Sequence, residues 1–309
     1  MTTWLVTGGA GFIGSHLCDA LIAAGDRVRV LDDLSTGSHD NLPAGVTLLL
    51  GDVADPALLD AALDGTAGCF HLAAIASVER GRLDWAETHR VNQTATVAVF
   101  DAIRRQGTPI PVVYASSAAV YGDCPTVPIR EDMACRPLSA YGADKYGCEL
   151  HAHVASHVHA IPTVGLRFFN VYGPRQDPAS PYSGVISIFC ERIRAGQPIT
   201  IYGDGGQTRD FVFVADVVAA LMAAMRLRAS VSQVFNICTG VPTSVLELAH
   251  LVASLSATTL APNFAAPRSG EIRDSLGDAS RARVGLGLVE PTPLREGLTQ
   301  VLDWLARRR

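Results

Sequence analysis

A tyrosine and a lysine stand four residues apart, as Tyr141 and Lys145. Residues at this spacing lie on one face of a helix, so the lysine ammonium would sit beside the phenol and favour its ionised form. A phenolate so placed can act as a general base toward a substrate hydroxyl. A surface lysine beside a core tyrosine is the simpler alternative. Order and distance favour the catalytic interpretation, because Ser116 and Ser117 end a predicted strand 24 residues earlier.

Three glycines, Gly8, Gly11 and Gly14, follow an apolar run at residues 4–6. The first would permit a tight turn from strand to helix, the second a close approach of backbone to a diphosphate, and the third close packing of the next helix. A helix predicted from Phe12 to about residue 24 would direct its N–H groups and positive dipole end toward the phosphates. The pattern therefore predicts a dinucleotide site.

A second predicted strand, residues 27–31, ends in Asp32 and Asp33. An acid about 20 residues beyond the glycines stands where the acceptor for a ribose hydroxyl belongs. A carboxylate there would bind the ribose of NAD and repel the 2′-phosphate of NADP, and no arginine follows in residues 34–37. The alternative is that Asp32 merely ends the strand and Asp33 caps the turn. The sequence predicts NAD as the cofactor.

Strand and helix patterns alternate through the first half of the chain, which predicts an α/β fold, a Rossmann-type doubly wound parallel sheet. After Asn170, glycines and prolines interrupt short elements, which indicates a second, smaller α/β lobe. We expect the NAD-binding domain to comprise residues 1–170 plus about 212–237. The smaller substrate-binding lobe would comprise about 171–211 plus 238–309.

Composition excludes several classes of function. With a net charge of −5 and no basic run beyond residues 307–309, nucleic acid is not an expected partner. The longest apolar stretch, nine residues at 217–225, is too short to cross a bilayer, so no membrane contact is expected. Seven scattered cysteines without a C-x-x-C, and no visible signal peptide, predict free thiols and a cytoplasmic protein. The histidines at 151–159 are interpreted as a solvated helix face, and no metal is predicted.

Taken together, these motifs resemble the extended short-chain dehydrogenase/reductase family, in its NAD-dependent nucleotide-sugar 4-epimerase branch of UDP-glucose and UDP-N-acetylglucosamine type. The resemblance covers nearly the whole chain. The matching segments are 7–14, 52–53, 71–74, 91–92, 116–122, 141–145, 166–173, 202–205, 208–211 and 267–271.

The resemblance implies a reaction. Ser117 would hydrogen-bond the reacting sugar hydroxyl, Tyr141 would take its proton, and Lys145 would hold the nicotinamide ribose. Hydride would leave the sugar C4 for NAD and return to the opposite face of a transient 4-keto sugar, while the diphosphate stays anchored. NAD would thus be a tightly held prosthetic group.

The resemblance also implies two sets of binding residues. The NAD set is Gly8, Gly11, Phe12, Ile13, Gly14, Asp32, Asp33, Ser35, Thr36, Gly37, Asp52, Val53, Leu72, Ala73, Ala74, Ala76, Asn92, Tyr141, Lys145 and Phe169. The substrate set is Ser77, Ser117, Asn170, Thr200, Tyr202, Arg209, Arg268, Glu271 and Ser275. Arg209, Arg268 and Asn170 would contact the diphosphate, and Glu271 the uridine ribose. Without the resemblance, surface salt bridges would be the preferred interpretation of both arginines.

Two positions bear on the reaction and the sugar. Ala118 and Ala119 stand where the family's dehydratases carry an Asp-Glu pair and its decarboxylases a glutamate, which leaves epimerisation. Ser275 stands where members restricted to glucose and galactose carry a tyrosine, so both UDP-Glc/UDP-Gal and UDP-GlcNAc/UDP-GalNAc are expected substrates.

Alternatives are an epimerase of a UDP-uronic acid or another nucleotide sugar, a nucleotide-sugar reductase, and a non-catalytic dinucleotide sensor. Asp32 argues against the reductase, which would consume NADPH. The resemblance further implies a homodimer built from helices near 90–105 and 142–159.

Overall fold

The computed structural model describes residues 1–177, 184–227, 231–260, 262–268 and 272–308. Within these residues the strands of the larger part form a seven-stranded sheet of order β10-β6-β5-β4-β1-β2-β3, and every pair in it is parallel. The strands are β1 (Thr3–Thr7), β2 (Arg27–Asp32), β3 (Thr47–Leu50), β4 (Cys69–His71), β5 (Val112–Ser117), β6 (Thr163–Phe168) and β10 (Gln233–Ile237). The predicted Rossmann-type fold is confirmed.

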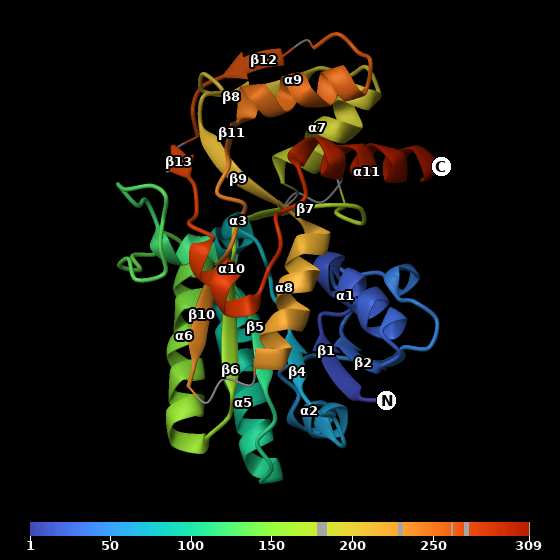
Figure 1. Cartoon of the computed structure of the whole chain (residues 1–309), viewed down its shortest axis with the longest axis vertical. Helices are drawn as coiled ribbons and strands as arrows, with labels where there is room; N and C mark the ends of the chain where they lie inside the picture. The colour runs from blue at the N-terminus through green and yellow to red at the C-terminus, as the bar shows by residue number, and fades with distance from the viewer. Residues whose placement is uncertain (178–183, 228–230, 261, 269–271, 309) are drawn as a thin grey trace.

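Helices cover both faces of this sheet (Figure 1), which is why its central strands are continuous apolar runs. Neighbouring residues of β1 show the division, since Val6 joins one core and Leu5 the other. The first core also contains side chains of α1 (Phe12–Ala23) and α8 (Val214–Leu227). The second contains those of α2 (Pro56–Leu63), α5 (Ala95–Gln106) and α6 (Ala140–His159).

The strand order reverses between β1 and β4. The chain runs outward from β1 to β3, and then returns to place β4 on the other side of β1. In open α/β sheets, ligands bind beyond the carboxyl ends of the strands at such a switch point. The ends of β1 and β4 are therefore the place to look for the dinucleotide site.

A second lobe lies beyond this end of the sheet (Figure 1). Its strands are β7 (Asn170–Tyr172), β8 (Ile199–Tyr202), β9 (Thr208–Phe213), β11 (Pro242–Ser244), β12 (Pro262–Ala265) and β13 (Asp274–Ser275). They pair as β11-β9-β13, with β7 on β9, and as β12-β8. Helices α7 (Val185–Arg194), α9 (Val245–Leu255) and α11 (Leu294–Arg307) share a core with them.

The remaining elements are short. They are α3 (Val78–Leu83), α4 (Trp85–His89), the π-helical segment η2 (Arg90–Thr94), the 3₁₀ turns η1 (His39–Asn41) and η3 (Ala118–Tyr121), and α10 (Ser280–Leu286). The last of these packs against α8 and β10 of the large sheet. A membrane-crossing helix is not present among the described residues. All seven cysteines are free thiols.

Candidate active site

The glycine turn between β1 and α1 is shaped by its first and third glycines. Gly8 has φ +69°, and a Cβ there would lie 2.7 Å from the Ala73 nitrogen. A Cβ on Gly14 would collide with the Gly8 carbonyl oxygen. Gly11, the N-cap of α1, is less crowded, because a Cβ would meet only that same oxygen at 3.3 Å. The first turn of α1 thus presents its N–H groups beside a residue without a side chain, which suits a diphosphate.

Asp32 is tied to this turn. Its carboxylate accepts hydrogen bonds from the backbone N–H of Ala10 at 2.9 Å and of Leu34 at 2.8 Å. The side chain is buried, and burial raises its pKa, while the two N–H groups act in the opposite direction. Asp33 is exposed and accepts from the Ser35 N–H and hydroxyl, so it caps its own turn. Thr36 is exposed beside them.

Other predicted NAD-contact residues lie in the first turn of α1 or follow β2 and β3. Gly37 packs on Ala10, whose oxygen would lie 2.8 Å from an added Cβ. The Asp52 carboxylate, just beyond β3, accepts from Arg90 at 2.7 Å, and Val53 beside it is buried. Phe12 and Ile13, in the first turn of α1, are half-buried.

A buried histidine that the sequence analysis did not select holds β1 against β4. The Thr7 hydroxyl accepts from the N–H groups of Leu72 and Ala73, both at 3.2 Å, so its own proton goes to His71 Nδ1 at 2.8 Å. The other ring nitrogen, Nε2, then carries the proton and donates to Thr96 at 3.0 Å. Burial, with a smaller contribution from the charge of nearby Lys145, lowers the pKa of His71 to about 3, so the ring is neutral.

Asn92 holds the rest of the segment that follows β4. It lies fully buried in η2, accepts from the Ile75 N–H at 2.8 Å, and donates to the Ile75 oxygen at 3.2 Å. The π-helical turn is the kind of local irregularity that often accompanies functional sites. Thr7, oriented by His71, and Asn92 thus hold the backbone of Leu72, Ala73 and Ile75. The segment 72–76 includes the predicted Leu72, Ala73, Ala74 and Ala76. Ser77 follows, buried as the N-cap of α3.

The three residues predicted to be catalytic come together at the ends of β5 and α6. Ser117 is the last residue of β5, and its hydroxyl accepts from the Ala119 N–H at 3.1 Å. Tyr141 lies half-buried in the first turn of α6. The Lys145 ammonium is 5.9 Å from the centre of the Tyr141 ring and donates to the Ala115 oxygen at 2.9 Å. A buried cation thus stands beside the phenol, as the helical spacing predicts.

Most of the predicted substrate residues belong to the second lobe. In the pairing of β13 with β9, Ser275 stands directly opposite Arg209. Asn170 is exposed at the start of β7, next to β9, and buried Phe169 precedes it. On the β8–β12 ribbon, the Arg268 guanidinium stacks 4.1 Å from the centre of the Tyr202 ring, with Thr200 half-buried on β8.

Arg268 also relates the second lobe to the first. Its charge contributes to the lowered pKa of Glu79 on α3, although the hydrogen bond from Arg82 is the main cause.

Glu271 lies outside the described residues. No group of His, Cys, Asp and Glu side chains suited to a metal occurs in the described part of the chain. His153 and His157 stack with ring centres 6.2 Å apart on the exposed side of α6.

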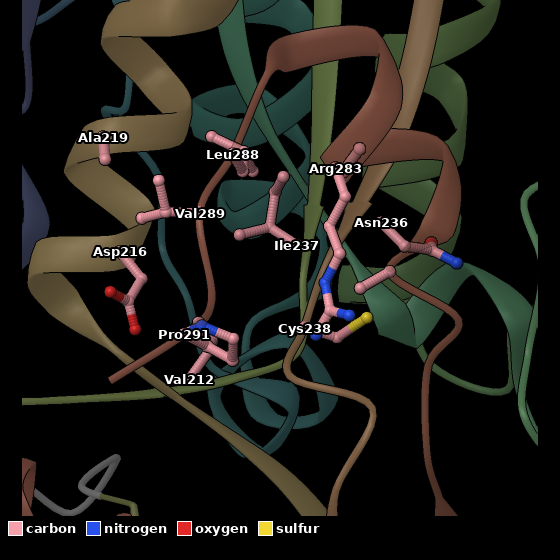
Figure 2. Close-up of a pocket in the computed structure, with 12 residues that line it drawn as sticks. Val212, Asp216, Ala219, Asn236, Ile237, Cys238, Arg283, Leu288, Val289 and Pro291 are labelled. Atoms are coloured by element: carbon pink, nitrogen blue, oxygen red, sulfur yellow. The ribbon is translucent and has the colours of Figure 1, made fainter. Parts of the chain in front are cut away.

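A separate small cavity lies under α8, β10 and α10 (Figure 2). Its volume is about 50 Å³, and most of its lining is apolar. Of its charged residues, Asp216 accepts two hydrogen bonds from Thr292, and Arg283 faces Glu290 at 3.4 Å. This cavity is too small for a dinucleotide or a nucleotide sugar, which need several hundred Å³.

Residues 4–238 match the model of the NAD dependent epimerase/dehydratase family. The chain belongs to this family. It is 38% identical to the UDP-glucose 4-epimerase of Mycolicibacterium smegmatis over 98% of each chain. Among solved structures, the UDP-glucose 4-epimerase of Thermotoga maritima with UDP-glucose has a TM-score of 0.95 and 35% identity over 99% of each chain. The UDP-N-acetylglucosamine 4-epimerase of Methanobrevibacter ruminantium, in complex with UDP-N-acetylmuramic acid, has a TM-score of 0.94 and 32% identity. The match covers 100% of this chain and 99% of the other.

Family membership confirms the resemblance seen in the motifs, and with it the NAD cofactor and an enzyme of the isomerase class. The family covers dehydratases as well as epimerases. The reaction and sugar of this member therefore have to be argued from its own residues.

Proposed function

We propose that this protein is an NAD-dependent UDP-sugar 4-epimerase that interconverts UDP-Glc and UDP-Gal. The observation that carries the proposal is the placement of Ser117, Tyr141 and Lys145 at one end of the sheet. Ala118 and Ala119 directly follow Ser117 there, in the η3 turn. This set can remove and return one hydroxyl proton. It offers no carboxylate at positions 118 and 119 for eliminating a second hydroxyl.

The glycine turn, Asp32 and the segment held by His71 and Asn92 fit NAD. The N–H groups of α1 would bind its diphosphate, and Asp32 would accept from its adenosine ribose. NAD, when bound, supplies a reversible hydride acceptor beside the sugar C4. Lys145 would contact the nicotinamide ribose.

The remaining steps belong to the chain's own side chains. Tyr141 takes the proton of the C4 hydroxyl while Ser117 holds that oxygen. After the keto sugar has turned to present its opposite face, Tyr141 returns the proton to the C4 oxygen. Arg209, Arg268 and Asn170 would keep hold of the diphosphate during the turn. We propose a division of work in which residues 1–170 and about 212–237 bind NAD, and about 171–211 and 238–309 bind the nucleotide sugar.

For the sugar, we propose that N-acetylated substrates are accepted besides the plain hexoses. Ser275 is half-buried and pairs with Arg209, so a side chain at this position projects from the strand next to the proposed diphosphate site. A serine leaves room that a tyrosine would fill. One solved relative carries the name UDP-N-acetylglucosamine 4-epimerase, which supports this range. A UDP-uronic acid epimerase is the alternative.

We also propose a homodimer. Three apolar residues at helical spacing on α6, Leu150, Val154 and Val158, are 54%, 49% and 62% exposed. An apolar stripe along a long surface helix is typical of an interface between copies. A four-helix contact of α5 and α6 from each protomer would cover it.

The test is an epimerisation assay on purified protein with UDP-Glc, UDP-GlcNAc and their uronic acids. We expect NAD(H) to co-purify, and UDP-Glc and UDP-Gal to interconvert without a net change in NADH absorbance. Stoichiometric consumption of added NADPH would indicate a reductase. Bound NAD with no turnover of any of these sugars would indicate a sensor.

A further inference from the structure

A buried ion pair lies directly behind the catalytic serine. Glu149 follows Lys145 by one helical step of four and Tyr141 by two, so the three share a face of α6. Its carboxylate accepts from the Ser116 hydroxyl at 2.5 Å and from Arg167 of β6 at 2.8 and 2.6 Å. The side chains of Glu149 and Arg167 are each 6% exposed.

The same pair also reaches the residue that ends the serine turn. Arg167 donates to the Tyr121 hydroxyl at 2.6 Å and stacks on its ring at 4.7 Å. Tyr121 in turn donates to Asn236 of β10 at 2.7 Å. Ser116 precedes Ser117, and Tyr121 ends the η3 turn that follows it. The ion pair therefore forms hydrogen bonds on both sides of the segment that carries Ser117.

This arrangement bears on what fixes the position of Ser117 relative to Tyr141. They lie on different elements, and two hydrogen bonds tie the end of β5 to this face of α6 in the described residues: Lys145 to Ala115, and Ser116 to Glu149. The proposed mechanism needs the Lys145 ammonium for the nicotinamide ribose. The Ser116–Glu149 bond is independent of the cofactor.

Stability alone does not account for the cluster. Burying an ion pair carries a large desolvation cost, and well-packed apolar residues often replace one without loss of stability. A buried ion pair is useful where side chains must be held in one orientation, because its hydrogen bonds are directional and apolar contacts are not.

We propose that Ser116, held by Glu149 and Arg167, is a positioning residue that sets Ser117 against Tyr141 for proton transfer. The proposal rests on the proposed epimerase function. Small errors in the placement of reacting groups cost rate more than binding, since a misplacement of about 1 Å can cost about 100-fold.

The test compares Ser116→Ala with Ser116→Thr. Alanine removes the hydroxyl, while Glu149 keeps Arg167 as its partner, so the fold is retained. Threonine keeps the hydroxyl in a strand position that favours β-branched residues. We expect Ser116→Ala to lower kcat by about 10- to 100-fold, with KM and bound NAD near wild type, and Ser116→Thr to recover most of it. Ser187→Ala is the matched control, because it removes a buried hydroxyl of α7 that donates to the Gly184 oxygen.

A second measurement does not depend on turnover. Hydrogen exchange of a peptide spanning residues 116–122 should speed up in Ser116→Ala, and stay slow in Ser116→Thr and Ser187→Ala. An unchanged kcat in Ser116→Ala, a threonine variant as impaired as alanine, or exchange equal in all variants would overturn the proposal. If wild type turns over no UDP-sugar, the proposed function fails instead, and the exchange data alone decide whether Ser116 fixes the loop.

Discussion

At the scale of single residues, the proposed chemistry depends most directly on Tyr141. Tyr141→Phe keeps the ring beside Lys145 and removes the proton acceptor. We predict a fall in kcat of at least about 100-fold, the lower range of general-base contributions. NAD content and thermal stability should stay near wild type. Tyr146→Phe, a half-buried tyrosine on the same helix, is the control. Near-normal turnover in Tyr141→Phe would contradict its role as the base.

We propose that cofactor choice also depends on one residue, Asp32. Asp32→Asn removes the negative charge and keeps one acceptor oxygen, so it retains the bond from the N–H of Ala10 or of Leu34 but not both. Binding of NADP relative to NAD should therefore rise by about tenfold, which corresponds to about 1.4 kcal/mol. Fluorescence titration of both cofactors with the emptied protein measures this. If Asp33→Asn shifts the preference and Asp32→Asn does not, the exposed Asp33 is the selector.

Sugar range is the third property that one side chain can test. Ser275→Tyr should lower kcat/KM for UDP-GlcNAc at least about tenfold more than for UDP-Glc, because the acetamido group loses its space. Ser275→Ala keeps a small side chain and should leave both values close to wild type. Equal losses on both substrates in Ser275→Tyr would show that this position does not select the sugar.

At the scale of elements, His71 joins β1, β4 and α5, and its burial makes the fold sensitive to acid. The pKa lies at about 3 in the folded protein, below the ordinary 6.5. Below pH 6.5 the unfolded chain therefore binds a proton here that the folded protein does not, so stability falls as the pH drops toward 3. This one group should cost about 2 kcal/mol between pH 7 and pH 5.

His71→Asn isolates that contribution, because asparagine can still donate and accept but does not titrate. Urea unfolding at both pH values should show a smaller loss on acidification for His71→Asn than for wild type. Comparing each protein with itself removes any difference in their stability at pH 7. An equal loss in the two proteins would mean that His71 is not the group responsible.

The sequence predicts the elements better than the contacts between them. Apolar runs separated by helical patterns identify β1, β5 and β6, because most side chains on both faces of those strands are buried. The hydrogen bonds of His71 reach residues 64 and 25 positions away, and no local pattern announces them. The strands β13 and β7, of two and three residues, could not be predicted either, because so short a segment shows no periodicity. Ser117, Tyr141 and Lys145 could be found because helical spacing and a strand end predict their neighbours.

At the scale of the whole molecule, the exposed stripe on α6 sets the expected assembly. Val154→Glu puts a charge in the middle of the stripe and should convert a dimer to monomers. Sedimentation velocity at micromolar concentration measures the change. Val284→Glu on α10 is the matched control, because Val284 is 88% exposed outside the proposed interface. A wild-type monomer, or a Val154→Glu variant that remains a dimer, would contradict the proposed contact.

The two lobes are joined to each other almost without connecting chain. One residue, Phe169, separates β6 from β7, and α8 begins at the residue after β9 ends. Ile129, on the loop beyond Ser117, also forms a bridge with Gly277, shortly after β13. Such junctions leave little slack for a hinge, so the two lobes should behave mechanically as one block. In the proposed reaction, the sugar would then turn inside a frame of nearly constant width, and the keto intermediate would stay confined until hydride returns. Stiffness of the backbone, more than the strength of any single contact, would prevent release of the 4-keto sugar before the reaction is complete.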